Sequence, residues 1–172
     1  HTLEGGAIIF RDDDIFESAK NIINFGITDG VPTQLGINAK LNEYQAGVGL
    51  TLLDNIDQNI EHRRHLFQLY NKSLSSFVEF PEWHEFATLN GSYMPIILKN
   101  EQEKRLIKAK LAEAGVPSRE YFSPSLNTIF NPQDLCPTSE SISKRILCLP
   151  LHYYLTHENV VFVVEKIKEA MI

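Results

Sequence analysis

Two clusters of residues have side chains that can bind metal ions. The acidic run Asp12–Asp14 could hold a divalent cation through its carboxylates. The same run stands where a turn would lead into a helix at Ile15–Asn24, which an aspartate would cap. His62 and His65 are three residues apart on a predicted helix, as in half of a zinc site. No cysteine or carboxylate group completes that site, and the two arginines between the histidines indicate a solvated face. We therefore expect no metal site.

Three other segments combine glycines and polar residues with short apolar runs. They are TLEGGAII at Thr2–Ile9, GINAKLNEYQAGVGL at Gly36–Leu50, and LCLPLH at Leu147–His152, which precedes a capped helix. In order and spacing, these segments resemble the DegT/StrS family of nucleotide-sugar aminotransferases, a branch of the aspartate-aminotransferase fold. The first two motifs are fairly specific, and the resemblance covers the chain from His1 to Ile172. It implies an enzyme that uses pyridoxal 5′-phosphate as its cofactor.

The resemblance puts the catalytic lysine outside this chain. In the family, the lysine that forms the Schiff base with the cofactor stands a few residues before the T-x-E-G-G segment, which here would precede His1. We therefore expect the chain to be the C-terminal part of a longer enzyme, to carry no catalytic residue of its own and to be inactive alone. Gly5 and Gly6 match the family's glycine pair, where a Cβ would crowd the cofactor ring. A plain turn is the alternative interpretation of this pair.

Asn38 matches the asparagine of the family's G-Y-N-A-R motif. The resemblance implies that this amide reaches across a dimer interface to the cofactor phosphate of the neighbouring subunit, so we expect a homodimer with shared sites. A helix start at this position would also favour an anion. The alternative is that Asn38 only caps the helix. The family's tyrosine is Ile37 here and its arginine is Lys40, which keeps the charge but loses the bidentate fork. Many relatives also have histidine in place of Phe25.

The segment Tyr121–Pro124 corresponds to a family segment near the sugar nucleotide. Tyr121 is therefore a predicted substrate contact, with packing in the core as the alternative. The implied reaction transfers an amino group, with glutamate as the expected donor, to a keto-sugar nucleotide. The members that it resembles suggest a dTDP-4-keto-6-deoxy sugar.

Two other functions are compatible with the sequence. Some relatives replace the lysine with histidine and act as sugar dehydratases with the same fold and cofactor. A non-catalytic piece that supports dimerisation or binds a partner is the other alternative. The residues that would discriminate between these functions lie upstream of His1.

The elements around the first two motifs are predicted from apolar patterns and breakers. Gly6–Phe10 is a continuous apolar run, typical of a strand buried on both faces of a parallel sheet. Gly26 suits the end of the helix that follows, and 27–37 is predicted to be a loop. A long helix should begin after Asn38. Its predicted inward residues are Leu53, Ile56, Ile60, Phe67, Tyr70 and Leu74, and its small-residue face is Ala46, Gly47 and Gly49.

The remainder alternates short strands with helices. The predicted strands are Phe77–Phe80, Ser92–Leu98, Ser118–Phe122 and Ile146–Leu149. Asn100 and Glu103 form a capping box for a helix that ends at Gly115, 123–143 is predicted to be a long ordered loop, and Thr156 caps the last helix. The predicted fold is α/β: the tail of the large cofactor domain (1–56), a long connecting helix, and a small two-layer C-terminal domain (57–172).

Composition excludes several other classes of protein. The formal net charge of −6 argues against nucleic-acid and anionic-membrane partners, because both need a concentrated basic face. No apolar run approaches the roughly 18 residues that span a bilayer. Cys136 and Cys148 are too few for a disulfide framework and are expected to be reduced thiols in a cytoplasmic protein.

Overall fold

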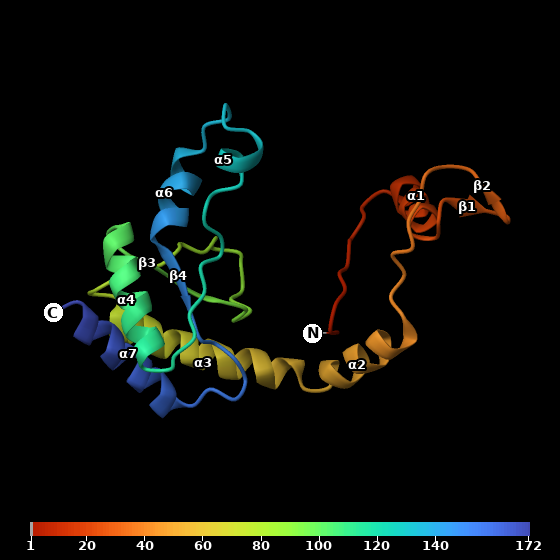
Figure 1. Cartoon of the computed structure of the whole chain (residues 1–172). Helices are drawn as coiled ribbons and strands as arrows, with labels where there is room; N and C mark the ends of the chain where they lie inside the picture. The colour runs from red at the N-terminus through yellow and green to blue at the C-terminus, as the bar shows by residue number, and fades with distance from the viewer. Residues whose placement is uncertain (1) are drawn as a thin grey trace. The chain divides into compact units, whose positions relative to one another are not determined.

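The computed structural model describes residues 2–172, and the chain divides into two compact units, His1–Ile56 and Asp57–Ile172. Figure 1 gives the order of the elements along the chain. Helices and short strands occur in both units, so the predicted α/β class is confirmed. That the units are the end of a large cofactor domain and a small C-terminal domain stays a prediction.

The second unit contains the hydrophobic core. Strands β3 (Met94–Ile97) and β4 (Ile146–Leu149) pair antiparallel, with Met94 opposite Leu149 and Ile97 opposite Ile146. Three helices, α3 (Ile56–Leu74), α4 (Glu101–Glu113) and α7 (His157–Ala170), bury their apolar stripes in the same core as these strands. The core residues from the helices are Leu66, Phe67, Tyr70, Leu74, Ile107, Leu111, Val160, Val163, Val164 and Ile167.

The two outer strands that we predicted are each reduced to one bridge. Glu79 pairs with Ile97 on one edge of the sheet, and Arg119 pairs with Cys148 on the other. Pro81 and Pro117 stand just beyond these positions, and proline has no N–H to continue a ladder. The sheet is therefore widened on both sides without two further regular strands.

The ends of the helices around this core follow the predicted capping residues. Asn100 accepts a hydrogen bond from the Glu103 amide (2.9 Å), while the Glu103 carboxylate accepts from the Lys99 amide (2.8 Å). Gly115, at φ +72°, ends α4 through a pair of Schellman bonds, in which its amide donates to Ala112 and the Val116 amide donates to Leu111. A capping box between Thr156 and Asn159 begins α7.

The predicted loop at 123–143 is wrong, because one helix forms within it and a second begins there. They are α5 (Asn127–Phe130) and α6 (Pro137–Arg145). Proline at the first helical position starts α6 instead of breaking it, since that position has no intrahelical partner for an N–H. The Glu140 carboxylate then accepts from the Cys136 amide (3.0 Å) and the Asn127 side chain (2.7 Å), which lowers the pKa of Glu140.

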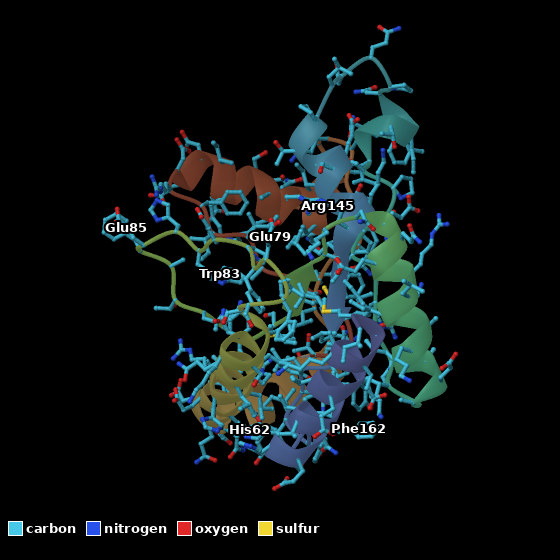
Figure 2. All side chains as sticks on the ribbon, turned by 90° about the vertical axis from the view of Figure 1, so that its left-hand side faces the viewer. His62, Glu79, Trp83, Glu85, Arg145 and Phe162 are labelled. Atoms are coloured by element: carbon cyan, nitrogen blue, oxygen red, sulfur yellow. The ribbon has the colours of Figure 1, made fainter. Side chains whose placement is uncertain are left out.

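Among the side chains labelled in Figure 2, Glu79, Trp83 and Arg145 join the outer segments of this unit to the rest of it. The Arg145 guanidinium donates to the Leu98 carbonyl (2.8 Å) and lies 3.8 Å from the Glu79 carboxylate. Trp83 packs edge-on against Phe67, with 6.2 Å between ring centroids. These contacts fasten the segment between α3 and β3 to one end of the sheet and to α3.

The predicted solvated face at His62–His65 is wrong for three of its four residues. His62 is half-buried, and its Nε2 atom lies 3.0 Å from the Leu155 carbonyl. The half-buried Arg64 donates to the Leu89 carbonyl (2.5 Å), and Arg63 bonds within its own helix. These side chains tie α3 to two loops. Within residues 2–172, no group of three or more metal-binding side chains gathers.

The first unit is organised by backbone hydrogen bonds, and Gly26 is its only buried residue among 2–56. Its helices are α1 (Asp13–Ile23), capped by Asp12, and α2 (Glu43–Leu53). Within the predicted loop, β1 (Ile27–Thr28) and β2 (Val31–Pro32) form a small hairpin. The predicted long helix is interrupted between α2 and α3, and Leu53 is exposed instead of inward.

The predicted strand at Gly6–Phe10 is wrong for this structure. Ile8 and Ile9 are 77% and 94% exposed, and the segment pairs with no strand among residues 2–172. A strand of a parallel sheet depends on neighbours on both sides, so its apolar pattern alone does not order it.

Two further properties concern the whole described part of the chain. None of its helices is long and apolar enough to cross a membrane, and both cysteines are free thiols, with the pKa of the buried Cys148 raised by burial.

Candidate functional site

The segment Gly36–Lys40 is docked on the end of α1 by its backbone. The Ile37 amide donates to the Ile22 carbonyl (2.8 Å), and the Ala39 amide donates to the Ile23 carbonyl (3.1 Å). The Phe25 amide returns a bond to the Ile37 carbonyl (3.1 Å). The three bonds bracket position 38, so the backbone of the motif is held at Asn38 from both sides.

Two glycines allow this docking. A Cβ on Gly36 would lie 2.0 Å from the Gly26 nitrogen and 2.7 Å from the Ile22 carbonyl oxygen. A Cβ on Gly26 would lie 2.0 Å from the Gln34 carbonyl oxygen, and Gly26 also has φ +69°. Real Cβ atoms do not approach backbone this closely, so both positions require glycine. The first residue of the family motif therefore has a structural purpose here, which is to let the motif reach α1.

Asn38 is exposed, and its side chain makes no hydrogen bond to another residue in 2–172. Its backbone forms a bridge with Asn24. The helix that we expected to start at Asn38 starts at Glu43, and its cap is Asn42, which accepts from the Gln45 amide (2.9 Å). The capping interpretation of Asn38 is therefore wrong, and so is the argument from a helix start at that residue. An amide with free donors remains.

The Lys40 side chain, unlike that of Asn38, is held by contacts within the first unit. Its ammonium group donates to the Asn24 side chain (2.9 Å) and lies 4.9 Å from the centre of the Phe25 ring. Two of the departures from the family motif, lysine for arginine and phenylalanine for histidine, thus contact each other. The contact holds the end of the motif on the same α1 terminus.

Gly5 and Gly6 lie in a turn that α2 supports. The Gln45 side chain donates to the Glu4 carbonyl (3.0 Å), as does the Thr2 hydroxyl (2.8 Å). Gly5 has φ +141°, which side-chain-bearing residues rarely adopt, whereas a Cβ on Gly6 would meet nothing within 4 Å. Residues Thr2–Ala7 and Leu41 surround an open cavity of about 520 Å³. Gly5 is thus required by its own backbone, and Gly6 borders free space.

The predicted small-residue face on α2 has one contact within the chain. A Cβ on Gly49 would lie 2.9 Å from the Thr2 methyl group, whereas one on Gly47 would meet nothing within 4 Å. Glycine at position 49 therefore lets the glycine turn approach α2.

Tyr121 belongs to a second cavity, in the second unit. Its ring stacks edge-on against Tyr93, with 5.3 Å between centroids and 72° between planes. Both tyrosines line a cavity of about 300 Å³, together with Arg119 and His152. Tyr121 is half-buried and is not among the side chains of the hydrophobic core. An aromatic wall with a guanidinium and an imidazole suits a sugar carrying an anionic group.

Sequence reasoning missed the ion pairs behind this cavity. Lys104 is buried, and its Nζ atom lies 2.7 Å from Glu120 Oε2, while Lys108 Nζ lies 2.5 Å from Glu120 Oε1. These hydrogen bonds to the lysines lower the pKa of Glu120. One signal was present in the sequence, because Lys104 falls on the inward stripe of α4 that Ile107 and Leu111 define.

Comparison with known proteins gives one consistent result. The family model of the DegT/DnrJ/EryC1/StrS aminotransferases matches residues 1–168. A dTDP-4-amino-4,6-dideoxy-D-glucose transaminase of Escherichia coli is 31% identical over 92% of this chain and 46% of its own length. Protein Rv3402c of Mycobacterium tuberculosis is 28% identical over 97% of this chain and 42% of its own length.

Solved structures agree with the sequence relatives. The structure of DesI in the presence of its TDP-sugar product superposes with a TM-score of 0.86 at 25% identity, covering 98% of this chain and 45% of that one. A family aminotransferase from Brucella abortus superposes with a TM-score of 0.80 at 26% identity, covering 92% and 44%. The chain spans about half the length of these relatives. It belongs to the DegT/DnrJ/EryC1/StrS aminotransferase family, whose members depend on pyridoxal 5′-phosphate.

Proposed function

We propose that this chain is part of an enzyme that moves an amino group from glutamate to a keto-sugar nucleotide, specifically a dTDP-4-keto-6-deoxy sugar. The sugar class is supported by two relatives, the dTDP-4-amino-4,6-dideoxy-D-glucose transaminase of Escherichia coli and DesI, whose structure was determined in the presence of its TDP-sugar product. The observation that carries the proposal is the docked motif Gly36–Lys40, which leaves the Asn38 amide exposed and without a partner in 2–172.

The residues of the first unit fit a phosphate-bearing cofactor. Pyridoxal 5′-phosphate supplies the electron sink for transamination when it is bound. The Asn38 amide would donate a hydrogen bond to its phosphate, and the backbone bonds on either side would keep that amide in place. Gly5 and Gly6 would let the chain turn beside the cofactor without a side chain in its way.

The residue that binds the cofactor covalently belongs, in this proposal, to a part of the protein that precedes the glycine turn. The first unit is then the end of the large cofactor domain, and the second unit is the small C-terminal domain. The extent of the relatives supports this division, because the chain covers less than half of the Escherichia coli transaminase. The isolated chain is then inactive.

Asn38 would serve the cofactor of a second subunit, so the protein acts as a homodimer with shared sites. The exposure of the first unit supports this, because none of its large hydrophobic side chains in 2–56 is buried. Sedimentation of the extended protein at micromolar concentration tests it. A monomer that still transaminates would contradict the shared site.

Transamination is tested with the protein extended at its N-terminus to the length of its relatives. Glutamate alone should convert the bound cofactor to its amino form, and the keto-sugar nucleotide should restore the original visible absorbance. Release of 2-oxoglutarate should match the aminated sugar mole for mole. A sugar product that has lost water and gained no nitrogen would instead establish the dehydratase reaction and overturn the proposal.

The isolated chain provides the matched control. Reduction with borohydride in the presence of pyridoxal 5′-phosphate, followed by mass mapping of peptides, should find no stoichiometric adduct on any of its lysines. The extended protein should give one adduct, on a lysine shortly before the T-x-E-G-G segment. A single stoichiometric adduct within residues 1–172 would contradict the proposed division of the site.

A further inference from the structure

A buried ion pair fixes the segment that contains Tyr121. The Lys104 side chain is about as buried as the apolar core around it, with 3% of the residue exposed. Its ammonium group is 2.7 Å from the Glu120 carboxylate, whose other oxygen is 2.5 Å from Lys108. A buried charge is costly in free energy unless it is paired. Moving Glu120 away would leave the buried Lys104 ammonium group without its partner, which is strongly unfavourable.

The two neighbours of Glu120 in the chain line the second cavity. Glu120 is held against α4, and Arg119 and Tyr121 both line the cavity that also contains Tyr93 and His152. The ion pair is therefore made by the residue that stands between two residues of the cavity wall.

Among residues 2–172, the backbone of this segment is attached to the sheet only at Arg119. Arg119 exchanges two hydrogen bonds with Cys148, at 3.0 Å and 2.8 Å. Beyond it, Phe122 is exposed, and no regular strand continues. Without the side-chain pair, the position of Tyr121 would depend on a single bridge and on the contact between two partly exposed rings.

We propose that Lys104, acting through Glu120, is a positioning residue for nucleotide-sugar binding. It holds Arg119 and Tyr121 at the cavity wall, where the guanidinium faces the anionic part of the ligand and the ring faces the sugar. Lys108 completes the clamp by binding the second carboxylate oxygen. This inference rests on the proposed function, because it assigns the ligand of the second cavity to the nucleotide sugar.

The test uses the extended holoenzyme and four substitutions in or beside α4. Lys104→Met and Glu120→Gln each remove one charge of the clamp, and Glu120→Gln also keeps the shape of its side chain. Lys110→Met is the matched control, because it breaks an exposed ion pair of the same helix, with Glu169 at 3.2 Å, away from the cavity. Lys104→Arg keeps the charge and serves as the conservative rescue.

Two readouts separate positioning from general destabilisation. Both clamp variants should raise the KM for the keto-sugar nucleotide about tenfold while kcat and the KM for glutamate change less than about twofold, the signature of lost ligand binding. Hydrogen exchange of residues 118–122 should become faster in both, whereas Lys110→Met should change neither readout and Lys104→Arg should keep most of the wild-type KM.

The outcomes distinguish the two proposals. If the wild-type enzyme turns over the sugar nucleotide but Glu120→Gln shifts its KM no more than Lys110→Met does, the clamp has no positioning role. The same holds if exchange in 118–122 stays at the wild-type rate. If the wild-type enzyme neither binds thymidine diphosphate nor uses the sugar nucleotide, the proposed function fails and the assignment of the cavity fails with it. Should Lys104→Met not fold, Glu120→Gln alone decides.

Discussion

Gly36→Ala should loosen the Asn38 motif from the end of α1. The added Cβ would lie 2.0 Å from the Gly26 nitrogen, 2.3 Å from the Phe25 carbonyl carbon and 2.7 Å from the Ile22 oxygen. All three are backbone atoms, so no side chain can rotate away. The segment would have to lift off the end of α1 and lose its hydrogen bonds there.

The magnitude follows from those contacts. Overpacking costs about 1–3 kcal/mol when side chains can adjust, and here the upper end applies because only backbone can move. Each lost amide hydrogen bond costs about 1 kcal/mol. This cost overlaps with the overpacking cost, because the same displacement of the segment breaks the bonds and relieves the clash. We expect local opening of the motif to become easier by about 3 kcal/mol, which is roughly a hundredfold in the opening constant.

The assay is hydrogen exchange at two amides that report on this docking. The Ile37 and Ala39 amides donate to the Ile22 and Ile23 carbonyls, so both are protected only while the motif lies on α1. Their exchange in Gly36→Ala should be about a hundred times faster than in the wild type. Gly47→Ala is the control: its Cβ meets nothing, and alanine should stabilise α2 by about 1 kcal/mol. Unchanged protection of Ile37 in Gly36→Ala would refute the steric argument.

Two further predictions concern the second unit. Tyr70 is fully buried, its hydroxyl has no hydrogen-bond partner among the described residues, and burial raises its pKa. Tyr70→Phe should therefore leave the free energy of unfolding unchanged or raise it by about 1 kcal/mol. A decrease of more than about 1 kcal/mol in urea unfolding would contradict this and show that the hydroxyl has a partner. Lys104 and Lys108 hold the pKa of Glu120 below its ordinary 4.5, so its contribution to stability is complete above about pH 4.5 and is lost as the pH falls through the lower folded value. Wild type should therefore lose more stability than Glu120→Gln between about pH 5 and pH 3, and parallel curves would contradict this.

Local signals predicted the structure well where a short segment decides its own conformation. Ile146–Leu149 forms the predicted strand, and Thr156 begins the last helix. Gly115 ends α4 as expected, because a residue at positive φ closes the last turn. Caps and glycines act over one turn, so their sequence pattern contains most of the information.

The failures arise where more distant groups decide. The apolar run Gly6–Phe10 has the composition of a buried strand, but its order depends on neighbours that the pattern cannot supply. The predicted loop at 123–143 contains Pro137, which begins α6 where the Glu140 carboxylate accepts from the Cys136 amide. Asn38 and Asn42 are both polar residues before the same helix, and only the backbone path shows that Asn42 is the cap.

The candidate site was predictable as a set of motifs but not as an arrangement. Sequence identified Asn38, Gly5 and Tyr121 through the family resemblance, and their roles toward ligands stay predictions. It could not show that Gly36 supports Asn38 through backbone contact, because that contact joins segments from different elements. The pairing of Lys104 with Glu120 was hidden for the same reason, since 16 positions separate them.

The affinity of the extended protein for pyridoxal 5′-phosphate, with Asn38 altered, tests the central claim most directly. If Asn38 donates to the cofactor phosphate, Asn38→Ala should weaken binding by about 1.5–3 kcal/mol, roughly 10- to 150-fold, and Asn38→Asp should be weaker still because it sets a carboxylate beside a dianion. Asn42→Ala should cost about 1 kcal/mol of stability and change the affinity far less than Asn38→Ala, since Asn42 caps α2 and its amide donates to the Gln45 side chain (2.8 Å). Titration by the visible absorbance of the bound cofactor gives all three values. Wild-type affinity in Asn38→Asp would contradict the account.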